Sequence, residues 1–344
     1  MFNGTLPFPD EICASERKLP YIALAPMEGL MDGVFRELLT AVGGIDHCVT
    51  EFIRVTNQVF PEKVFYRLCP ELHNGGRTQA GTPVHVQLLG SDPYYLARNA
   101  EKAARLGALA IDLNFGCPAK TVNRSQGGAV LLQYPDLLNR IATAVREAVP
   151  ADIPVSAKMR LGFKDKSLAL ENAAALADGG IQWLTVHART KTEGYKPPAY
   201  WSWIAEIKKK VSIPVLANGE IWTPAQAEQC QQESNSDLLM IGRGLVATPD
   251  LGRIIKEPDY QPMNWKQHLE LMVAMADQLP HLTDKQLTDR LKQWLHYFSM
   301  HSAEIKAVFD QVKRERERAP FFAALDGYIS SRELLAPRGR QAQV

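Results

Sequence analysis

The sequence predicts an α/β protein: a closed (β/α)8 TIM barrel followed by a small C-terminal all-helical domain. Eight short apolar runs, rich in Val, Ile and Leu, alternate with longer helical patterns through most of the chain. This alternating part spans roughly 225 residues, which is the size of an eight-stranded barrel. After about Leu251 the strand-like runs stop, and only helical patterns follow.

Each predicted strand is a short apolar run that a Gly, a Pro or a polar cluster follows. The eight runs are residues 21–25, 46–51, 84–89, 110–114, 155–159, 183–187, 215–218 and 238–241. Helical patterns between them include 93–106, 134–149 and 168–178. Repeated strand–helix units imply a parallel sheet with helices outside it. A doubly wound open sheet is the alternative, but eight consecutive units would make an unusually large open sheet.

The chain beyond the barrel has a different pattern. Pro258, Tyr260 and Pro262 mark a linker. Three amphipathic helical patterns follow, with no strand between them, at 265–279, 285–300 and 303–318. We therefore expect four parts, which are an N-terminal extension at 1–20, a catalytic barrel at 21–255, a helical domain at 263–330 and a flexible tail at 331–344.

Composition narrows the class of protein. The formal net charge is +1, so any contact with RNA must come from local basic patches. The five cysteines are scattered and form no Cys-x-x-Cys, which argues against zinc ribbons and disulfide frameworks and favours the reducing cytoplasm. No residues have metal-ligand spacing, so we expect no metal. We find no signal peptide and no apolar stretch of membrane-spanning length, and we expect no membrane association.

Polar residues and glycines follow every predicted strand. In a barrel the active site lies at the carboxyl ends of the strands, so these residues should meet at one rim. Gln87, Lys158 and His187 stand at the ends of three apolar strands, where each must find a hydrogen-bond partner. Such residues favour a ligand-binding rim over a purely structural one.

The turns after the seventh and eighth predicted strands are typical of a phosphate site. Gly219, Gly242 and Gly244 leave backbone N–H groups in a concave arrangement, and Arg243 adds a positive charge. Barrels usually bind phosphate at this position. The alternative is that these glycines only make tight turns.

Lys158 interrupts an apolar run. Its side chain either reaches solvent from the end of the strand or places its ammonium beneath an electron-accepting ring, where it would stabilise negative charge. His187 could hydrogen-bond the same ligand, although a lone histidine at a strand end is more often structural.

Cys117 lies between Gly116 and Pro118, in a loop at the predicted rim. A buried structural cysteine is the alternative interpretation. A thiol at the rim can act as a nucleophile or as a general acid. A general acid must stay protonated near pH 7, as an unperturbed thiol with a pKa of about 8.5 does.

The order and spacing of six motifs resemble those of the tRNA-dihydrouridine synthases over roughly residues 20–320. The motifs are Ala25-Pro26-Met27-Glu28-Gly29, Leu113-Asn114-Phe115-Gly116-Cys117-Pro118, Lys158-Met159-Arg160-Leu161-Gly162, His187-Ala188-Arg189-Thr190, Asn218-Gly219-Glu220-Ile221 and Ile241-Gly242-Arg243-Gly244. Glu28, Glu51-Phe52-Ile53-Arg54 and Arg290-Leu291-Lys292-Gln293-Trp294-Leu295 look most like the bacterial C-type subfamily. That subfamily is associated with the sixteenth nucleotide of tRNA, in the D-loop.

The resemblance implies an FMN-binding barrel, a helical tRNA-binding domain and reduction of the C5–C6 double bond of a uridine. NADPH would reduce the flavin, hydride would pass from flavin N5 to C6, and Cys117 would donate the proton to C5. The implied FMN-binding residues are Pro26, Met27, Glu28, Gln87, Lys158, His187, Asn218, Gly219, Glu220, Gly242 and Arg243. The residues implied to hold the flipped uridine or nearby RNA are Arg54, Asn114 and Arg160.

In the helical domain the resemblance implies tRNA contacts, although a solvated helix face is the alternative. The residues concerned are Arg290, Lys292, Tyr297 and Lys313. The chain departs from the family pattern at Phe115, often Met or Cys, and at residues 123–128, which are bulkier than the usual glycine-dense loop. Both departures could alter how the loop after Cys117 moves.

Two rival functions remain open. One is an FMN barrel reductase that acts on a small molecule, which would not need the helical domain. The other is a non-enzymatic tRNA-binding or chaperone protein, in which Cys117→Ala would leave function undiminished. We expect a monomer without an obligate protein partner.

Overall fold

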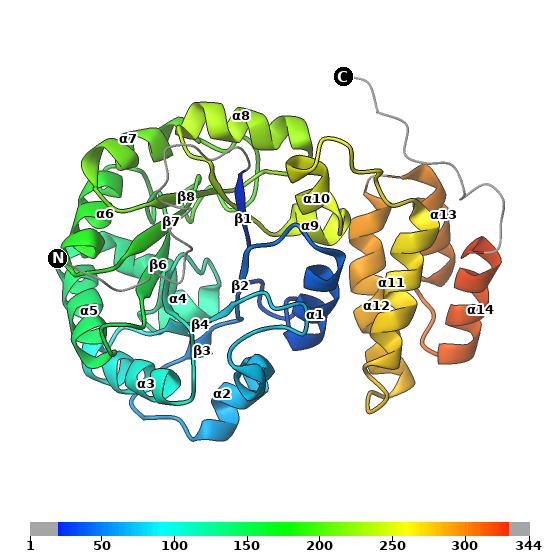
Figure 1. Cartoon of the computed structure of the whole chain (residues 1–344), viewed down its shortest axis with the longest axis horizontal. Helices are drawn as coiled ribbons and strands as arrows, with labels where there is room; N and C mark the ends of the chain where they lie inside the picture. The colour runs from blue at the N-terminus through cyan, green and yellow to red at the C-terminus, as the bar shows by residue number, and fades with distance from the viewer. Residues whose placement is uncertain (1–19, 301, 330–344) are drawn as a thin grey trace.

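The computed structural model describes residues 20–300 and 302–329. The predicted tail at 331–344 and the predicted extension at 1–20, apart from Pro20, lie outside these residues. A ring of parallel strands stands inside a layer of helices, and four further helices pack along one side of that layer (Figure 1).

Eight parallel strands close into a ring, so the predicted barrel is confirmed and the open-sheet alternative is wrong. The order around the ring is β2-β1-β9-β8-β7-β6-β5-β4, and β2 pairs with β4 to close it. The eight strands are β1 Tyr21–Leu24, β2 His47–Val49, β4 Val84–Leu89, β5 Ile111–Phe115, β6 Val155–Arg160, β7 Trp183–His187, β8 Val215–Asn218 and β9 Leu238–Ile241. Each overlaps one predicted run.

A ninth strand, β3 (Ile53–Arg54), was not predicted. Its residues pair with Leu88 and Leu89 at the end of β4. Two residues are too few to produce a hydrophobic pattern, which explains why this strand could not be predicted. This strand places Arg54 at the carboxyl rim of the barrel.

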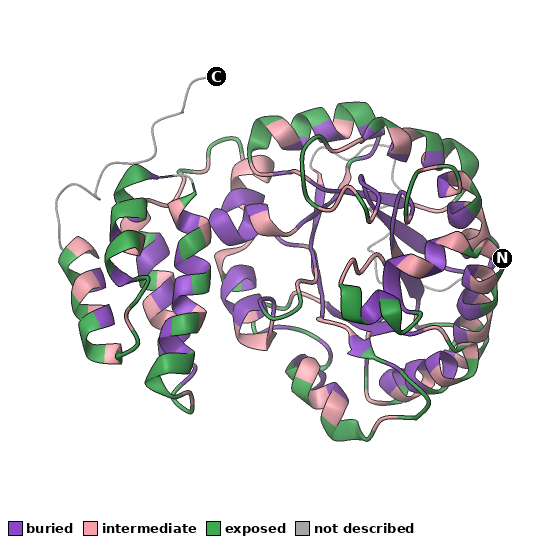
Figure 2. Ribbon diagram, turned by 180° about the vertical axis from the view of Figure 1, so that it is seen from behind, coloured by how far each residue is buried: buried purple, intermediate pink, exposed green. Residues whose placement is uncertain are grey.

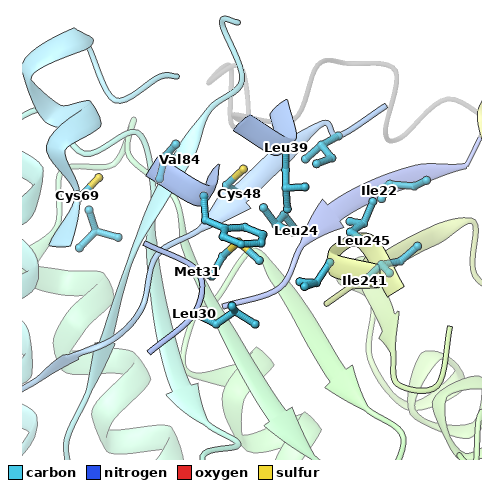
Figure 3. Close-up of a cluster of buried hydrophobic side chains, with 14 of the residues drawn as sticks. Ile22, Leu24, Leu30, Met31, Leu39, Cys48, Cys69, Val84, Ile241 and Leu245 are labelled. Carbon is cyan, nitrogen blue, oxygen red and sulfur yellow. The ribbon is translucent and has the colours of Figure 1, made fainter. Parts of the chain in front are cut away.

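The ring strands are apolar on both faces because both faces are buried. Tyr21 and Ala23 belong to a cluster drawn from five strands and from Ala110 just before β5, which fills the barrel interior. Ile22 and Leu24 alternate with them and belong to the larger cluster that includes the surrounding helices. Figure 3 shows these two side chains beside Ile241 of β9.

Helices cover the outside of the ring with their buried faces inward and their exposed faces in solvent (Figure 2). Asp32 and Asp92 begin α1 and α3 by accepting hydrogen bonds from backbone N–H groups of the first turn. The α-helices of the barrel are α1 Gly33–Val42, α2 Glu62–Leu68, α3 Pro93–Arg105, α4 Lys120–Arg124, α5 Pro135–Ala148, α6 Ala169–Asp178, α7 Ser202–Lys210, α8 Pro224–Ser234, α9 Arg243–Ala247 and α10 Leu251–Lys256.

The described residues of the C-terminal part form four helices where three were predicted. They are α11 Trp265–Asp277, α12 Asp284–Ser299, α13 Ala303–Val312 and α14 Arg318–Ile329. The predicted helix at 303–318 is wrong beyond Val312, because the run of charged residues that follows forms the turn before α14. Capping boxes at Asn264 and Thr283 begin α11 and α12.

Helix α12 packs directly on the barrel. The Trp294 indole is buried, donates a hydrogen bond to the Val246 carbonyl of α9 (2.9 Å) and lies 4.5 Å from the Phe35 ring of α1. A single apolar cluster therefore runs from the outer face of the ring into the helical part. The division of the chain into domains stays a prediction.

Within the described ranges, no helix has both the length and the apolarity needed to cross a membrane.

Candidate functional site

A cavity of about 740 Å3 opens at the carboxyl ends of the ring strands, a volume typical of ligand sites. The structure brings all eleven residues predicted to hold FMN to its wall. Four other predicted residues also line it, which are Cys117, Asn114, Arg160 and Tyr297. Tyr297 and Gln293 come from α12, so the helical part forms one side of the cavity. The predicted residues that lie outside its lining are Arg54, Arg290, Lys292 and Lys313.

A buried hydrogen-bond network fixes the floor of the cavity. The Asp112 carboxylate accepts from Gln87 Nε2 (2.7 Å) and from Ser156 Oγ (2.6 Å). Gln87 Oε1 in turn accepts from Asn114 Nδ2 (2.8 Å). Burial raises the pKa of Asp112, and these two donors oppose the rise. The amides of Gln87 and Asn114 are thus oriented by the protein itself.

The backbone of Cys117 is held on both sides. Asn114 Oδ1 accepts from the backbone N–H groups of Gly116 and Cys117, both at 2.9 Å. The Cys117 carbonyl accepts from Asn123 Nδ2 (2.9 Å) and from the Ala129 N–H (3.1 Å). Both ends of the Asn114 amide are therefore engaged within the protein, which favours a positioning role over direct substrate contact.

The Cys117 thiol is half-buried and faces the cavity. Burial, followed by the negative charge of Glu28, raises its pKa above the ordinary value. The Ala119 N–H, Arg160 and Arg54 act in the opposite direction but do not reverse the shift. The thiol therefore stays protonated at pH 7, which suits a general acid and not a thiolate nucleophile.

Lys158 projects from β6 into the cavity. Its ammonium donates to Asn218 Oδ1 (3.1 Å), and Asn218 is anchored by donation to the Met240 carbonyl (2.7 Å). Burial and then the neighbouring Arg160 lower the pKa of Lys158 to about 8, although Asp112 opposes this. Most Lys158 side chains remain charged at pH 7 in the free protein.

His187 is buried at the end of β7, and its imidazole is neutral. Burial lowers its pKa well below the ordinary value, and four cations add to the effect, which are Arg160, Lys158, Arg189 and Arg243. Its Nδ1 has no hydrogen-bond partner among the described residues. A buried nitrogen without a partner is costly, so it is suited to a ligand in the cavity, and the four cations favour an anionic one.

Arg243 stands between two aromatic rings at the end of the cavity. Its guanidinium lies 5.0 Å from the Tyr195 ring and 4.8 Å from the Trp222 ring. Glu220 ion-pairs with Arg189 and lies 3.8 Å from Arg243. Tyr195 and Trp222 line the cavity but were not predicted as site residues. Trp222 could have been noticed two positions after the Asn218-Gly219-Glu220 motif, whereas Tyr195 lies in a loop without a motif.

Arg160 is buried and connects the loop after β5 to the loop after β7 by hydrogen bonds. It donates to the carbonyls of Gly116 (2.9 Å), Thr190 (3.0 Å) and Gly194 (2.9 Å). Arg54, in contrast, is exposed and makes one weak hydrogen bond, to the Thr121 carbonyl (3.3 Å). Of these two arginines, Arg54 is the one with donors available to an incoming molecule.

The basic residues predicted to contact tRNA on the helical part are already engaged. Lys292 donates to the Glu315 carbonyl (2.7 Å) and pairs with Asp289 (2.8 Å). Lys313 pairs with Asp310 (2.8 Å) at the surface. Arg290 bonds to the loop after β1. In the part of the chain that the structure describes, no group of His, Cys, Asp or Glu side chains is arranged to hold a metal ion.

The fold and the cavity together define a barrel protein with a polar, cation-rich ligand site at the carboxyl ends of its strands. The family model described as dihydrouridine synthase (Dus) matches residues 23–328. The chain belongs to this family.

Curated relatives align over most of their length. A tRNA-dihydrouridine(16) synthase of Pseudomonas putida is 54% identical over 303 residues, which cover 87% of this chain and 94% of the relative. Proteins of the same name from Shewanella oneidensis and Vibrio cholerae are 48% and 44% identical; the matches cover 85% and 89% of this chain, and 93% and 95% of the relatives.

Among solved structures, a 2-naphthoyl-CoA reductase complex superposes with a TM-score of 0.53 at 14% identity. The match covers 72% of this chain and 52% of that protein. At this identity the likeness shows the barrel fold alone.

Proposed function

We propose that this protein reduces the C5–C6 double bond of uridine 16 in the D-loop of tRNA to 5,6-dihydrouridine, with FMN as its flavin and NADPH as reductant. The observation that carries the proposal is the protonated Cys117 thiol, held over a cavity rich in cations. The names of the relatives support the substrate and the position. We propose that the protein acts in the cytoplasm, where its tRNA substrate is found, and that it works as a monomer.

The residues present fit FMN, which combines a flat ring, a hydroxylated chain and a dianionic phosphate. His187 Nδ1, which has no hydrogen-bond partner in the part of the chain that the structure describes, and the charged end of the cavity at Arg243 supply groups that such a ligand needs. We propose that Arg243, Gly242 and Gly219 hold the phosphate, that Glu220 orients Arg243, and that the other predicted residues surround the ring and chain. These others are Pro26, Met27, Glu28, Gln87, Lys158, His187 and Asn218. When bound, FMN supplies the hydride that NADPH first provides.

The chain's own residues then complete the reduction. Addition of hydride at C6 leaves negative charge on C5 and its neighbouring carbonyl oxygen. Cys117 Sγ donates its proton to C5, and the resulting thiolate regains a proton from solvent. Asn114 and Asn123 hold the Cys117 backbone in place, so the thiol is positioned without a large entropic cost at the moment of transfer.

The uridine must leave the folded tRNA to reach this cavity. Gln293 and Tyr297 of α12 lie on the cavity wall, and Arg54 is exposed at the rim. We propose that they meet the extruded nucleotide or its neighbours. Because the net charge is only +1, recognition would rest on tRNA shape and a few phosphate contacts.

The direct test is to map dihydrouridine in tRNA taken from a strain that lacks the enzyme, after incubation with purified protein, FMN and NADPH. We expect dihydrouridine at position 16 alone. A protein without affinity for FMN, or modification at another uridine only, would refute the proposal. Free UMP serves as the comparison substrate, because a small-molecule reductase would reduce it as fast as tRNA.

A further inference from the structure

We infer that Arg290 is a positioning residue that couples the helical part of the protein to the cavity by holding the loop after β1. Its expected effect on FMN rests on the proposed function, whereas its effect on the loop does not. Arg290 lies on α12, and the loop, residues 25–32, connects β1 to α1.

Most hydrogen bonds of the Arg290 guanidinium go to this loop, and one goes to Gln293 Oε1 on the same helix (3.1 Å). Nη1 donates to the Gly29 carbonyl (2.9 Å), and Nη2 donates to the Leu30 carbonyl. Nη2 also forms an ion pair with Asp32 (2.7 Å). The side chain is only 12% exposed, and its guanidinium lies 5.5 Å from the Phe35 ring. Charge-assisted bonds in this number are among the stronger polar contacts in proteins.

The loop is also attached within the barrel, where the Ala25 N–H at its start donates to the Ile241 carbonyl of β9 (2.9 Å). Glu51, which follows β2, accepts from the Gly29 N–H. Arg36 of α1 donates to the Met31 carbonyl (2.8 Å) and is itself bound to Glu71. Within residues 20–300 and 302–329, Arg290 supplies the hydrogen bonds to this loop that come from outside the barrel.

The same loop forms part of the cavity wall. Pro26, Met27, Glu28 and Leu30 line the cavity, whereas Arg290 does not. The bonded carbonyl of Gly29 is next to Glu28, whose charge also raises the pKa of Cys117. Arg290 thus acts on the cavity mainly through the loop, and also through Gln293, without lining the cavity itself.

This arrangement changes the meaning of the tRNA contact predicted for Arg290. An RNA phosphate at this guanidinium would compete with three acceptors of the loop. The same helix carries Gln293 and Tyr297 on the cavity wall. Any shift of α12 would therefore move the wall and the loop together.

The experiment compares Arg290→Ala with Lys285→Ala, which removes another cation of α12, one that pairs with Asp289 at the surface. Hydrogen exchange of residues 26–32 is measured without tRNA, and FMN affinity by quenching of flavin fluorescence. We expect faster exchange and FMN binding weaker by about 10-fold in Arg290→Ala. Lys285→Ala should show the same loop exchange and the same FMN affinity as the unaltered protein.

A second variant, Asp32→Asn, removes the charge of the ion pair but keeps an oxygen for the Phe35 N–H that caps α1. Asp32→Asn should also speed hydrogen exchange of the loop and weaken FMN binding, each by a smaller factor than Arg290→Ala. Unaltered loop exchange in both variants, with only tRNA affinity lowered in Arg290→Ala, would overturn the inference. If the unaltered protein itself failed to bind FMN, the proposed function would fall, while loop exchange would still test Arg290.

Discussion

At the scale of single residues, the site depends on how Cys117 and Lys158 are surrounded. Burial raises the pKa of the thiol and lowers that of the ammonium, so one group keeps its proton more firmly and the other releases it more readily. Residues 123–128 appeared in the sequence only as a bulky departure from the family pattern. In the structure Asn123, which belongs to this segment, donates a hydrogen bond from its amide to the Cys117 carbonyl and so helps to position Cys117.

Cys117→Ala should keep FMN and tRNA binding but slow turnover by about 100-fold or more, as expected when a general acid is removed. Single-turnover reduction of tRNA and a tRNA-binding assay measure the two effects. Cys230→Ala is the matched control, since Cys230 is buried in α8 away from the cavity. Full turnover by Cys117→Ala would exclude the acid role.

FMN affinity should fall as pH rises through about 8. The pKa of Lys158 lies below its ordinary value, so the ammonium is present below about pH 8 and lost above it. Titrations of FMN between pH 6.5 and 9.5 would show the decline, and Lys158→Met should bind weakly without that decline. A flat profile in the unaltered protein would contradict the contact between Lys158 and the flavin.

At the scale of elements, the sequence predicted the parts with strong apolar patterns. Every ring strand and the helices α3, α5, α6, α11 and α12 lie close to their predicted bounds. The failures have physical reasons. β3 is too short for a pattern, and the break between α13 and α14 falls in a charged run that is equally compatible with a helix. Tyr195 and Trp222 reach the cavity through loop geometry that no periodicity encodes.

Trp294→Phe should destabilise the protein by about 1–3 kcal/mol, because the Val246 carbonyl loses its indole donor in a buried interface. Denaturant unfolding with a single transition measures the change. Trp203→Phe, on the half-buried surface of α7, is the comparison and should cost less. Equal costs would mean that the contact between α12 and the barrel contributes little.

At the scale of the whole molecule, the barrel interior contains ionisable groups that burial keeps neutral. His47 and His85 stack at 4.3 Å inside the ring. Burial and then the charge of Arg77 lower the pKa of His85 to about 3. Both ring nitrogens of His85 lack partners among the described residues.

Stability should decrease as the pH falls below about 6.5. The unfolded chain binds a proton at His85 there, whereas the folded chain does so only near pH 3. Each such histidine costs about 1.4 kcal/mol of unfolding free energy per pH unit across this window. Denaturant unfolding between pH 7 and 5 measures the slope of the unfolding free energy against pH. His85→Phe should lower this slope by the contribution of one bound proton. An unchanged slope would show that His85 is protonated in the fold.

The apolar cluster that joins α12 to the outside of the barrel has a consequence for protein engineering. The helical part is not a module that can be exchanged at the linker near Pro258. A chimera designed to modify another nucleotide would need to import the matching outer faces of α1 and α9 along with the new helices. Without them it would expose the surface around Phe35 and Val246 and misplace one wall of its own cavity.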